Sequence, residues 1–313
     1  MILLDKNPAK AHDSGLLDGY QSPPSTESSD CQLMFSEFDP VFLASLVAAL
    51  LATGVIGGLM AGLLGVGGGI VIVPVLYHAF SLLGIAPEVL MHIAVGTSLA
   101  TIVATSISSA RAHYRKGGID VDLLKSWGPF IALGVLLGAV LGANLDGLVL
   151  SGIFAVIALF VAANMAFRPD GWHMRETLPG APGRQIIATV IGFFSVMMGI
   201  GGGTLAVPTL TAFNYPIRKA VGTASAIGLI IAIPGAASFA VFGWGRAELP
   251  PFSVGYINLI GFALIVPMSV FMAPVGAKLA YTINTRMLRL CFAIFLLITG
   301  LRMLYDIYAA YAV

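Results

Sequence analysis

Ten long apolar runs divide this 313-residue sequence, and each run is bounded by glycine, proline or charged residues. A helix that spans a bilayer needs about 20 mainly apolar residues. Because 58% of the residues are apolar and only 10% are charged, a water-soluble fold could not bury them all. We therefore expect an all-α polytopic membrane protein with about 8–10 spans, surrounded by the lipid bilayer. The runs cover residues 41–64, 67–83, 87–110, 126–145, 148–167, 186–199, 203–214, 219–243, 255–280 and 288–308.

Charge and cysteine content exclude several classes of protein. The net charge of +1 provides no basic surface for nucleic acid. The two cysteines, Cys31 and Cys291, form neither a disulfide framework nor a metal site. The sequence has no H-E-x-x-H motif, no P-loop and no dinucleotide-binding glycine pattern. We therefore expect no catalytic residues, no cofactor and no metal.

The polar residues at the start of the chain set its domain organisation. Residues 1–40 carry seven acidic and two basic residues, and we expect them to form a disordered acidic tail rather than a signal peptide. Residues 41–167 then form a first transmembrane repeat and residues 186–308 a second. Residues 168–185 are expected to be a cytoplasmic linker between the two repeats.

The two transmembrane halves contain copies of the same motifs. In each half a glycine-rich segment breaks a long apolar stretch, and a proline follows the break at the same position. Three matches in the same order indicate an internal duplication. They are GGGIVIVP at 67–74 with GGGTLAVP at 201–208, AVGTS at 94–98 with AVGTA at 220–224, and Gly142-Ala143 with Gly276-Ala277.

The basic residues predict how the two halves are oriented. They fall into four clusters: Arg111, Arg115, Lys116 and Lys125; Arg168, Arg175 and Arg184; Arg218 and Lys219; and Lys278, Arg286 and Arg289. If all four face the cytoplasm, each broken segment enters and leaves on one side of the membrane. Each half is then a glycine-broken helical hairpin plus three transmembrane helices, and the halves are inverted repeats. The alternative is one crossing per broken segment, giving parallel repeats with Arg218 outside.

The glycine breaks are the first candidate binding site. Backbone amides at the start of a helix lack partners and carry a partial positive charge, which favours an anion. Two such helix starts, meeting near the middle of the membrane, would bind a small anionic substrate. Close packing of neighbouring helices is the alternative explanation for the glycines. The candidate residues at the breaks are Gly67, Gly68, Gly69, Ile70, Gly201, Gly202, Gly203 and Thr204.

Hydroxyl groups next to the breaks are the second group of candidates. The repeated Gly-Thr motif contains Thr97 and Thr223, and Ser98 and Ser225 follow it closely. The hydroxyls of these four residues could donate to the oxygens of an anion. Hydrogen bonding to a carbonyl of a preceding turn or of another helix is the alternative. For Thr101 and Thr105, which share a helix face with Thr97, we expect that structural role.

Ionisable residues are expected at the ends of the spans rather than well inside them. Glu88, Arg111, Asp146 and Glu248 lie at such ends. His78 and His92 are the titratable residues within the first half, and a packing role is expected for both ahead of proton transfer. Arg111 and His113 at the cytoplasmic mouth either gather anions or follow the positive-inside rule.

With these motifs, the sequence resembles the TauE/SafE family of membrane anion exporters. The resemblance rests on the segments 65–74 and 94–98 and on their copies at 199–208 and 220–224, and it covers about residues 41–308. It implies transport of sulfite or of a small organosulfonate such as sulfoacetate, usually outward. Ala224 stands where the first half has Ser98, so the two halves do not offer the same hydroxyls.

The sequence as a whole predicts a multi-pass transporter of the inner (plasma) membrane. It would export its anion by alternating access, as one half rocks against the other. An anion channel, an uptake permease for a sulfur-containing oxyanion and a membrane scaffold remain as alternatives. The sequence also leaves a homo-oligomer open.

Overall fold

The structure is a computed structural model that describes residues 39–167, 177–282 and 285–312. The chain divides into two units, Met1–Leu43 and Ala44–Val313. In the first unit, the backbone N–H of Val41 donates to Oδ1 of Asp39 at 2.9 Å, where a helix begins. Residues 1–38 of the expected acidic tail lie outside the described residues. Residues 168–176 of the expected linker lie outside them as well.

The described part of the chain is helical, which confirms the all-α prediction. Six of its helices are long and apolar enough to cross a membrane: α2, α4, α5, α6, α9 and α10. The helices are α2 (Pro40–Leu64), α3 (Gly69–Leu82), α4 (Pro87–Tyr114), α5 (Val121–Asn144), α6 (Gly147–Phe167), α7 (Gly183–Met197), α8 (Gly203–Ala212), α9 (Ile217–Phe242), α10 (Leu259–Leu279) and α11 (Thr285–Ala312). A short antiparallel hairpin of β1 (Ser253–Val254) and β2 (Ile257–Asn258) connects α9 to α10.

Helix α5 begins earlier than its apolar run and helix α10 later, and a capping residue explains each difference. Asp120 accepts a hydrogen bond from the Leu123 N–H at 3.0 Å, so α5 begins five residues before the expected Ser126. Asn258 accepts one from the Gly261 N–H at 2.8 Å, and the residues just before it belong to the β-hairpin. Side-chain caps of this kind satisfy amides that a helix start leaves unpaired.

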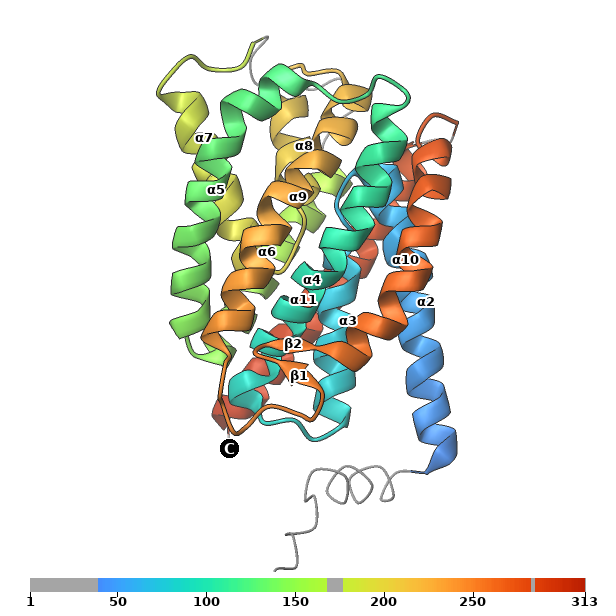
Figure 1. Ribbon diagram of the computed structural model, residues 1–313, viewed down its shortest axis with the longest axis vertical. Helices are drawn as coiled ribbons and strands as arrows, with labels where there is room; N and C mark the ends of the chain where they lie inside the picture. Colours follow the sequence, from blue (N-terminus) through green and yellow to red (C-terminus); the bar gives the residue numbers. More distant parts are fainter. Residues whose placement is uncertain (1–38, 168–176, 283–284, 313) are drawn as a thin grey trace, which may run out of the picture. The chain divides into compact units, whose positions relative to one another are not determined.

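Equivalent helices of the two halves run in opposite directions (Figure 1). Helix α4 rises from the lower to the upper end of the view, whereas its counterpart α9 descends. Helix α5 descends and its counterpart α10 rises. The α7–α8 pair enters and leaves at the upper end, and α3 returns to the lower end. The sequence analysis expected opposite directions of this kind if the halves are inverted repeats.

Each half packs its first helix against the second of the three helices that follow the hairpin in the other half. Glycines make this possible, because a Cβ on Gly58 of α2 would overlap the backbone of Ser269 on α10. A Cβ on Gly192 of α7 would likewise overlap the backbone of Ile131 on α5. Close approach of this kind is typical of small residues in membrane helices.

The packing corrects the register of one of the three motif matches. Gly276 of α10 lies against the carbonyl of Leu59, and Gly138 of α5 lies against the carbonyl of Phe193. Leu59 and Phe193 occupy equivalent positions before the two glycine breaks. The structural partner of Gly276 is therefore Gly138, one helical turn before the Gly142 that the sequence comparison matched to it.

Candidate functional site

The two glycine breaks lie against each other in the interior of the molecule. A Cβ on Gly201 would overlap the carbonyl oxygen of Val66, and a Cβ on Gly203 would overlap that of Gly65. A Cβ on Gly69 would overlap the carbonyl oxygen of Gly199. All of these residues are buried. The structure thus brings together the two breaks that the sequence predicted to meet.

Backbone conformation also requires glycine at several of these positions. The φ angles of Gly65, Gly67 and Gly68 are +67°, +74° and +82°, and that of Gly199 is +62°. Residues with a Cβ rarely adopt such angles. A Cβ on Gly69 or Gly201 would meet backbone of the opposite break, one on Gly68 would meet the Gly57 backbone, and one on Gly67 or Gly202 would meet an isoleucine side chain. Close packing therefore accounts for these five glycines in this conformation.

Most of the candidate hydroxyls are engaged within the protein. Ser98 donates to the carbonyl of Gly199 at 2.7 Å, which ties α4 to the second break. Ser225 donates to the carbonyl of Gly222 at 2.6 Å, within its own helix. Thr101 and Thr105 donate to carbonyls of the preceding turn of α4. These bonds agree with the structural role expected for Thr101 and Thr105, and they extend such a role to the two serines.

The two Gly-Thr motifs hold the two capping residues. The Thr97 hydroxyl accepts from the backbone N–H of Asn258 at 2.8 Å, and the Thr223 hydroxyl accepts from that of Asp120 at 2.9 Å. Each threonine therefore fixes the start of a span in the other half. A Cβ on the glycine that precedes each threonine would overlap the same loop backbone, which explains the Gly-Thr pairing.

These contacts reveal a fourth pair of duplicated motifs that the sequence analysis missed. Residues 117–120 read Gly-Gly-Ile-Asp and residues 255–258 read Gly-Tyr-Ile-Asn. Both begin with a glycine of positive φ, +65° at Gly117 and +55° at Gly255. The Gly-x-Ile-Asp/Asn pattern was the available signal, but it falls in loops and was not compared.

Thr204 differs from the other candidate hydroxyls. Its side chain is 4% exposed, and its Oγ1 has no hydrogen-bond partner among the residues that the structure describes. Thr204 lies in the first turn of α8, beside Gly203, and both residues line a pocket. Its counterpart in the first half is Ile70, which is fully buried and has no hydroxyl.

The pocket beside Thr204 is apolar except for a few polar groups. About 880 Å³ of space free of protein atoms lies within and in front of it, open solvent included. Leu63, Leu64, Met165, Val207, Ile217 and Val221 form much of its apolar wall, and His113, Asn164, Thr204, Thr211, Arg218 and Tyr281 are its polar lining residues. No Asp or Glu is among the described residues that line it. Arg218 makes the pocket suitable for an anion.

Two further polar atoms in this pocket lack partners. The Nδ1 atom of His113 and the hydroxyl of Tyr281 are buried, and neither forms a hydrogen bond within the described segments. The guanidinium of Arg218 lies 5.4 Å from the centre of the Tyr281 ring, and the Lys116 ammonium lies 4.2 Å from it. Buried polar atoms are rarely left unpaired unless a water or ligand joins them. Sequence reasoning assigned no binding role to Tyr281 or Arg218.

Asp120 is the most heavily engaged acidic group near the basic end of the spans. The Tyr215 hydroxyl donates to its Oδ2 atom, and this hydrogen bond is the main reason why the pKa of Asp120 lies below its ordinary value. Burial raises the pKa of Tyr215, and the hydrogen bond to Asp120 raises it further. Asp120 is therefore a structural carboxylate rather than a proton carrier.

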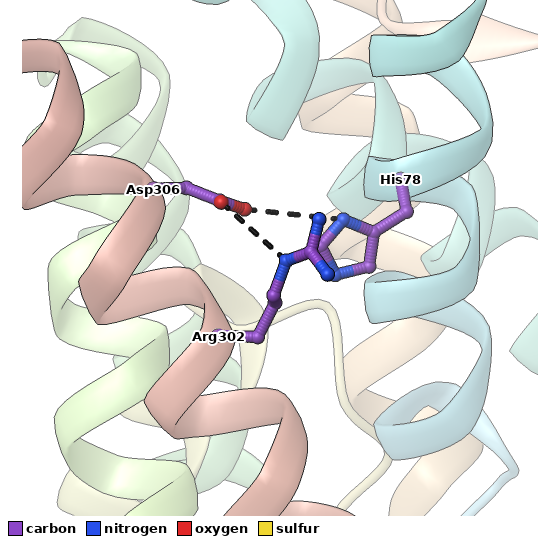
Figure 2. A network of polar contacts seen from close by, with 3 residues as sticks. All are labelled: His78, Arg302 and Asp306. Atoms are coloured by element: carbon purple, nitrogen blue, oxygen red, sulfur yellow. Dashed lines mark ion pairs between the residues drawn. The ribbon is translucent and has the colours of Figure 1, made fainter.

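One charged cluster corrects the expectation that no charge lies well inside a span. Figure 2 shows Arg302 and Asp306 on α11 facing His78 on α3. Arg302 Nε lies 3.6 Å from Asp306 Oδ1, and His78 Nδ1 lies 4.0 Å from Asp306 Oδ2. The Arg302 side chain is 67% exposed, so the pair is a surface feature of α11.

His92 has the packing role that the sequence predicted. Its two ring nitrogens lie 3.1 Å from the carbonyl oxygen of Glu88 and 3.2 Å from that of Gly142. The ring stacks on Tyr256, with the two ring centres 4.9 Å apart. Across the described residues no group of three His, Cys, Asp or Glu side chains is arranged to hold a metal ion.

The known proteins that this chain resembles are described as membrane transporters. Residues 50–303 match the family described as Sulfite exporter TauE/SafE. A probable membrane transporter protein of Haemophilus influenzae is 34% identical over 81% of this chain and 96% of its own length. A probable membrane transporter protein of Methanocaldococcus jannaschii is 26% identical over 83% of this chain and 96% of its own length. The probable membrane transporter protein YunE of Bacillus subtilis is 27% identical over 82% of this chain and 97% of its own length. No solved structure gives a significant match.

Proposed function

We propose, from the premise that this chain belongs to the TauE/SafE sulfite exporter family, that it exports a small organosulfonate or sulfite across the plasma membrane by alternating access. The chain is a multi-pass membrane protein of a transporter family, and its relatives carry names of probable membrane transporters. The identity of the anion, the direction of transport and the mechanism are what we propose beyond that.

The buried, unpartnered hydroxyl of Thr204 is the observation that carries the proposal. It stands in the first turn of α8, where backbone amides lack intrahelical partners and the helix dipole favours negative charge. An oxyanion at this helix start would accept hydrogen bonds from Thr204 and from the amides that follow Gly203. Arg218, an exposed residue, also lines this pocket and would supply the opposite charge.

This proposal locates the anion beside the contact of the two breaks rather than between them. Gly203 and Thr204 remain candidate binding residues. The glycines 67–69, 201 and 202, together with Ile70, would instead form the packed frame that supports the start of α8. Thr97, Ser98, Thr223 and Ser225 would hold loops and breaks in position through the hydrogen bonds already described.

The composition of the pocket wall favours an organosulfonate over inorganic sulfite. Side chains such as Leu63, Val207 and Val221 offer no hydrogen bonds, and they would contact the hydrocarbon part of a substrate. A bare oxyanion would leave this apolar wall unused and would still lose its hydration shell. An anion with one charged end and a short apolar body fits both parts of the lining.

The opposite course of equivalent helices supports alternating access between inverted repeats. The pocket lies beside the basic helix ends, where Arg218 and Tyr281 meet Lys116. Tyr256 stacks on His92, and the backbone N–H of Asn258 in β2 donates to Thr97, contacts that would help to close the other end. A negative-inside potential would assist anion exit by about 2.3 kcal/mol per charge per 100 mV.

Flux measurements with Thr204→Val and Thr204→Ser test this proposal. In proteoliposomes loaded with labelled ethanesulfonate, sulfoacetate or sulfite, we expect saturable efflux, with ethanesulfonate preferred over sulfite. Thr204→Val keeps the shape and removes the hydroxyl, so it should raise the half-saturating concentration about tenfold. Thr204→Ser should stay close to the unaltered chain.

Other outcomes of the same measurement contradict the proposal. Flux that rises linearly with concentration would indicate an anion channel, and accumulation against a gradient only from outside would indicate an uptake permease. Equal flux through the Val and Ser variants would remove Thr204 from the site. No flux of any of the three anions would favour a scaffold protein.

A further inference from the structure

We infer that the pocket beside Thr204 binds its anion together with a proton, which is held on Nδ1 of His113. This inference rests on the proposed function, because it concerns the same pocket. It adds a proton-linked residue to the binding step.

The hydrogen bond of His113 fixes which ring nitrogen carries the proton. Nε2 lies 2.8 Å from the carbonyl oxygen of Gly62, and a carbonyl oxygen can only accept. Nε2 therefore carries a hydrogen in both protonation states of the ring. In neutral His113, Nδ1 then has a lone pair and no hydrogen.

The Nδ1 atom that holds this lone pair is buried, and its residue lines the pocket. The His113 side chain is 1% exposed, and Nδ1 has no partner in the segments described. His113 lines the same pocket as Thr204 and Arg218. An atom that only accepts is a poor neighbour for an oxyanion, whose oxygens are also acceptors.

Protonation of Nδ1 turns this mismatch into a match. The imidazolium presents an N–H to the pocket and adds a positive charge beside that of Arg218. A bound oxyanion would accept a hydrogen bond from this N–H, and the opposite charges of the imidazolium and the anion would strengthen that bond. Binding of the anion therefore favours binding of the proton, and the reverse holds to the same extent.

Positively charged residues lie around His113. The cationic groups around His113 are Lys116 in the loop that follows α4 and Arg218 on α9, and Arg111 and Arg115 lie nearby in sequence. The rings of Tyr281 and His113 lie with their centres 6.2 Å apart. The neighbouring helix α2 contributes the Gly62 carbonyl and carries no charged side chain. With no acidic side chain among the described lining residues, the anion itself supplies the negative charge that stabilises the proton.

Binding of ethanesulfonate to the purified full-length chain tests the inference. This anion stays fully ionised across the working range, so any pH dependence belongs to the protein. Between about pH 5.5 and about pH 8.5 we expect affinity to fall about tenfold per pH unit once His113 is neutral in the empty pocket. Titration calorimetry in buffers of different ionisation enthalpy should report uptake of close to one proton per anion.

Two variants separate the proton site from the anion site. His113→Gln cannot be protonated, and its amide can still donate to Gly62, so binding should lose its pH dependence and its proton uptake. His78→Gln is the matched control at another histidine, and it should keep both. Thr204→Val should bind more weakly with the pH dependence unchanged.

Each outcome supports or overturns the inference. Ethanesulfonate binding by the unaltered chain without proton uptake would overturn it and leave the proposed function intact. Retained pH dependence in a folded His113→Gln variant would overturn it as well. No binding at any pH would overturn both proposals. The proton count on the unaltered chain decides the matter if that variant does not fold.

Discussion

At the scale of single residues, Asp120 joins three segments of the chain. Its carboxylate caps α5 through the Leu123 N–H at 3.0 Å and accepts a hydrogen bond from the Tyr215 hydroxyl. Its backbone N–H donates to Thr223 of α9 at 2.9 Å. The equivalent Asn258 caps α10 and donates to Thr97 in the same way. The amide side chain of Asn258 thus performs the capping role without a charge.

This equivalence predicts different results for two substitutions of Asp120. Asp120→Ala removes the cap and the partner of Tyr215, so we expect a loss of about 1–2 kcal/mol of folding free energy. Asp120→Asn keeps a capping oxygen, as Asn258 does, and should cost less than half of that. Thermal unfolding of the detergent-purified variants measures the difference, and equal melting temperatures for the two would contradict the capping role.

Acid should affect the unaltered chain more than Asp120→Asn. The Tyr215 hydroxyl holds the pKa of Asp120 below its ordinary value in the folded state. Its stabilising contribution is therefore present above the unfolded pKa of about 4 and is lost as pH falls through the lower folded pKa. Melting temperatures between about pH 6 and about pH 3 should fall more for the unaltered chain.

At the scale of secondary-structure elements, the two broken hairpins depend on glycine for a direct backbone contact. A Cβ on Gly203 would overlap the carbonyl of Gly65, and one on Gly201 would overlap that of Val66. Both oxygens are backbone carbonyl atoms of the opposite break, so neither can move aside as the end of a side chain could. The contact therefore tolerates no added carbon on either of the two residues.

Alanine substitutions at the breaks test this contact. We expect Gly203→Ala and Gly201→Ala each to cost about 3 kcal/mol or more, and to reduce the yield of folded protein. Gly180→Ala is the control, because a Cβ there would meet nothing within 4 Å. Size-exclusion profiles and melting temperatures provide the measurement. Full stability of Gly203→Ala would mean that the breaks separate in the native protein.

The elements show which parts of the fold and site could be predicted from sequence. Apolar length and glycine or proline boundaries predicted the helices to within a few residues, and the duplicated glycines predicted which breaks would meet. The polar wall of the pocket could not be predicted, because His113, Arg218 and Tyr281 come from segments far apart in the chain. Whether Thr204 or Ser98 has an unpaired hydroxyl also depends on carbonyls that only the folded chain brings near.

At the scale of the whole molecule, the orientation of the two halves can be measured directly. Replacing Cys31 and Cys291 by serine leaves a background for single cysteines at Asp146, Lys219 and Glu248. If the repeats are inverted, Asp146→Cys and Glu248→Cys should react with an impermeant maleimide on intact cells. Lys219→Cys should react only after permeabilisation, whereas parallel repeats would expose it outside.

The duplicated chain has two unequal faces. Thr204 corresponds to Ile70, and Arg218 corresponds to His92, whose ring nitrogens already face carbonyls. An equivalent cavity formed by the first half would therefore lack both the hydroxyl and the cation, and would bind the anion more weakly. Because transport is reversible, the electrochemical gradient still determines the ratio of anion concentrations inside and outside at equilibrium. In the proposed exporter, this difference would let the site bind dilute anion from the cytoplasm and bind the same anion only weakly from outside.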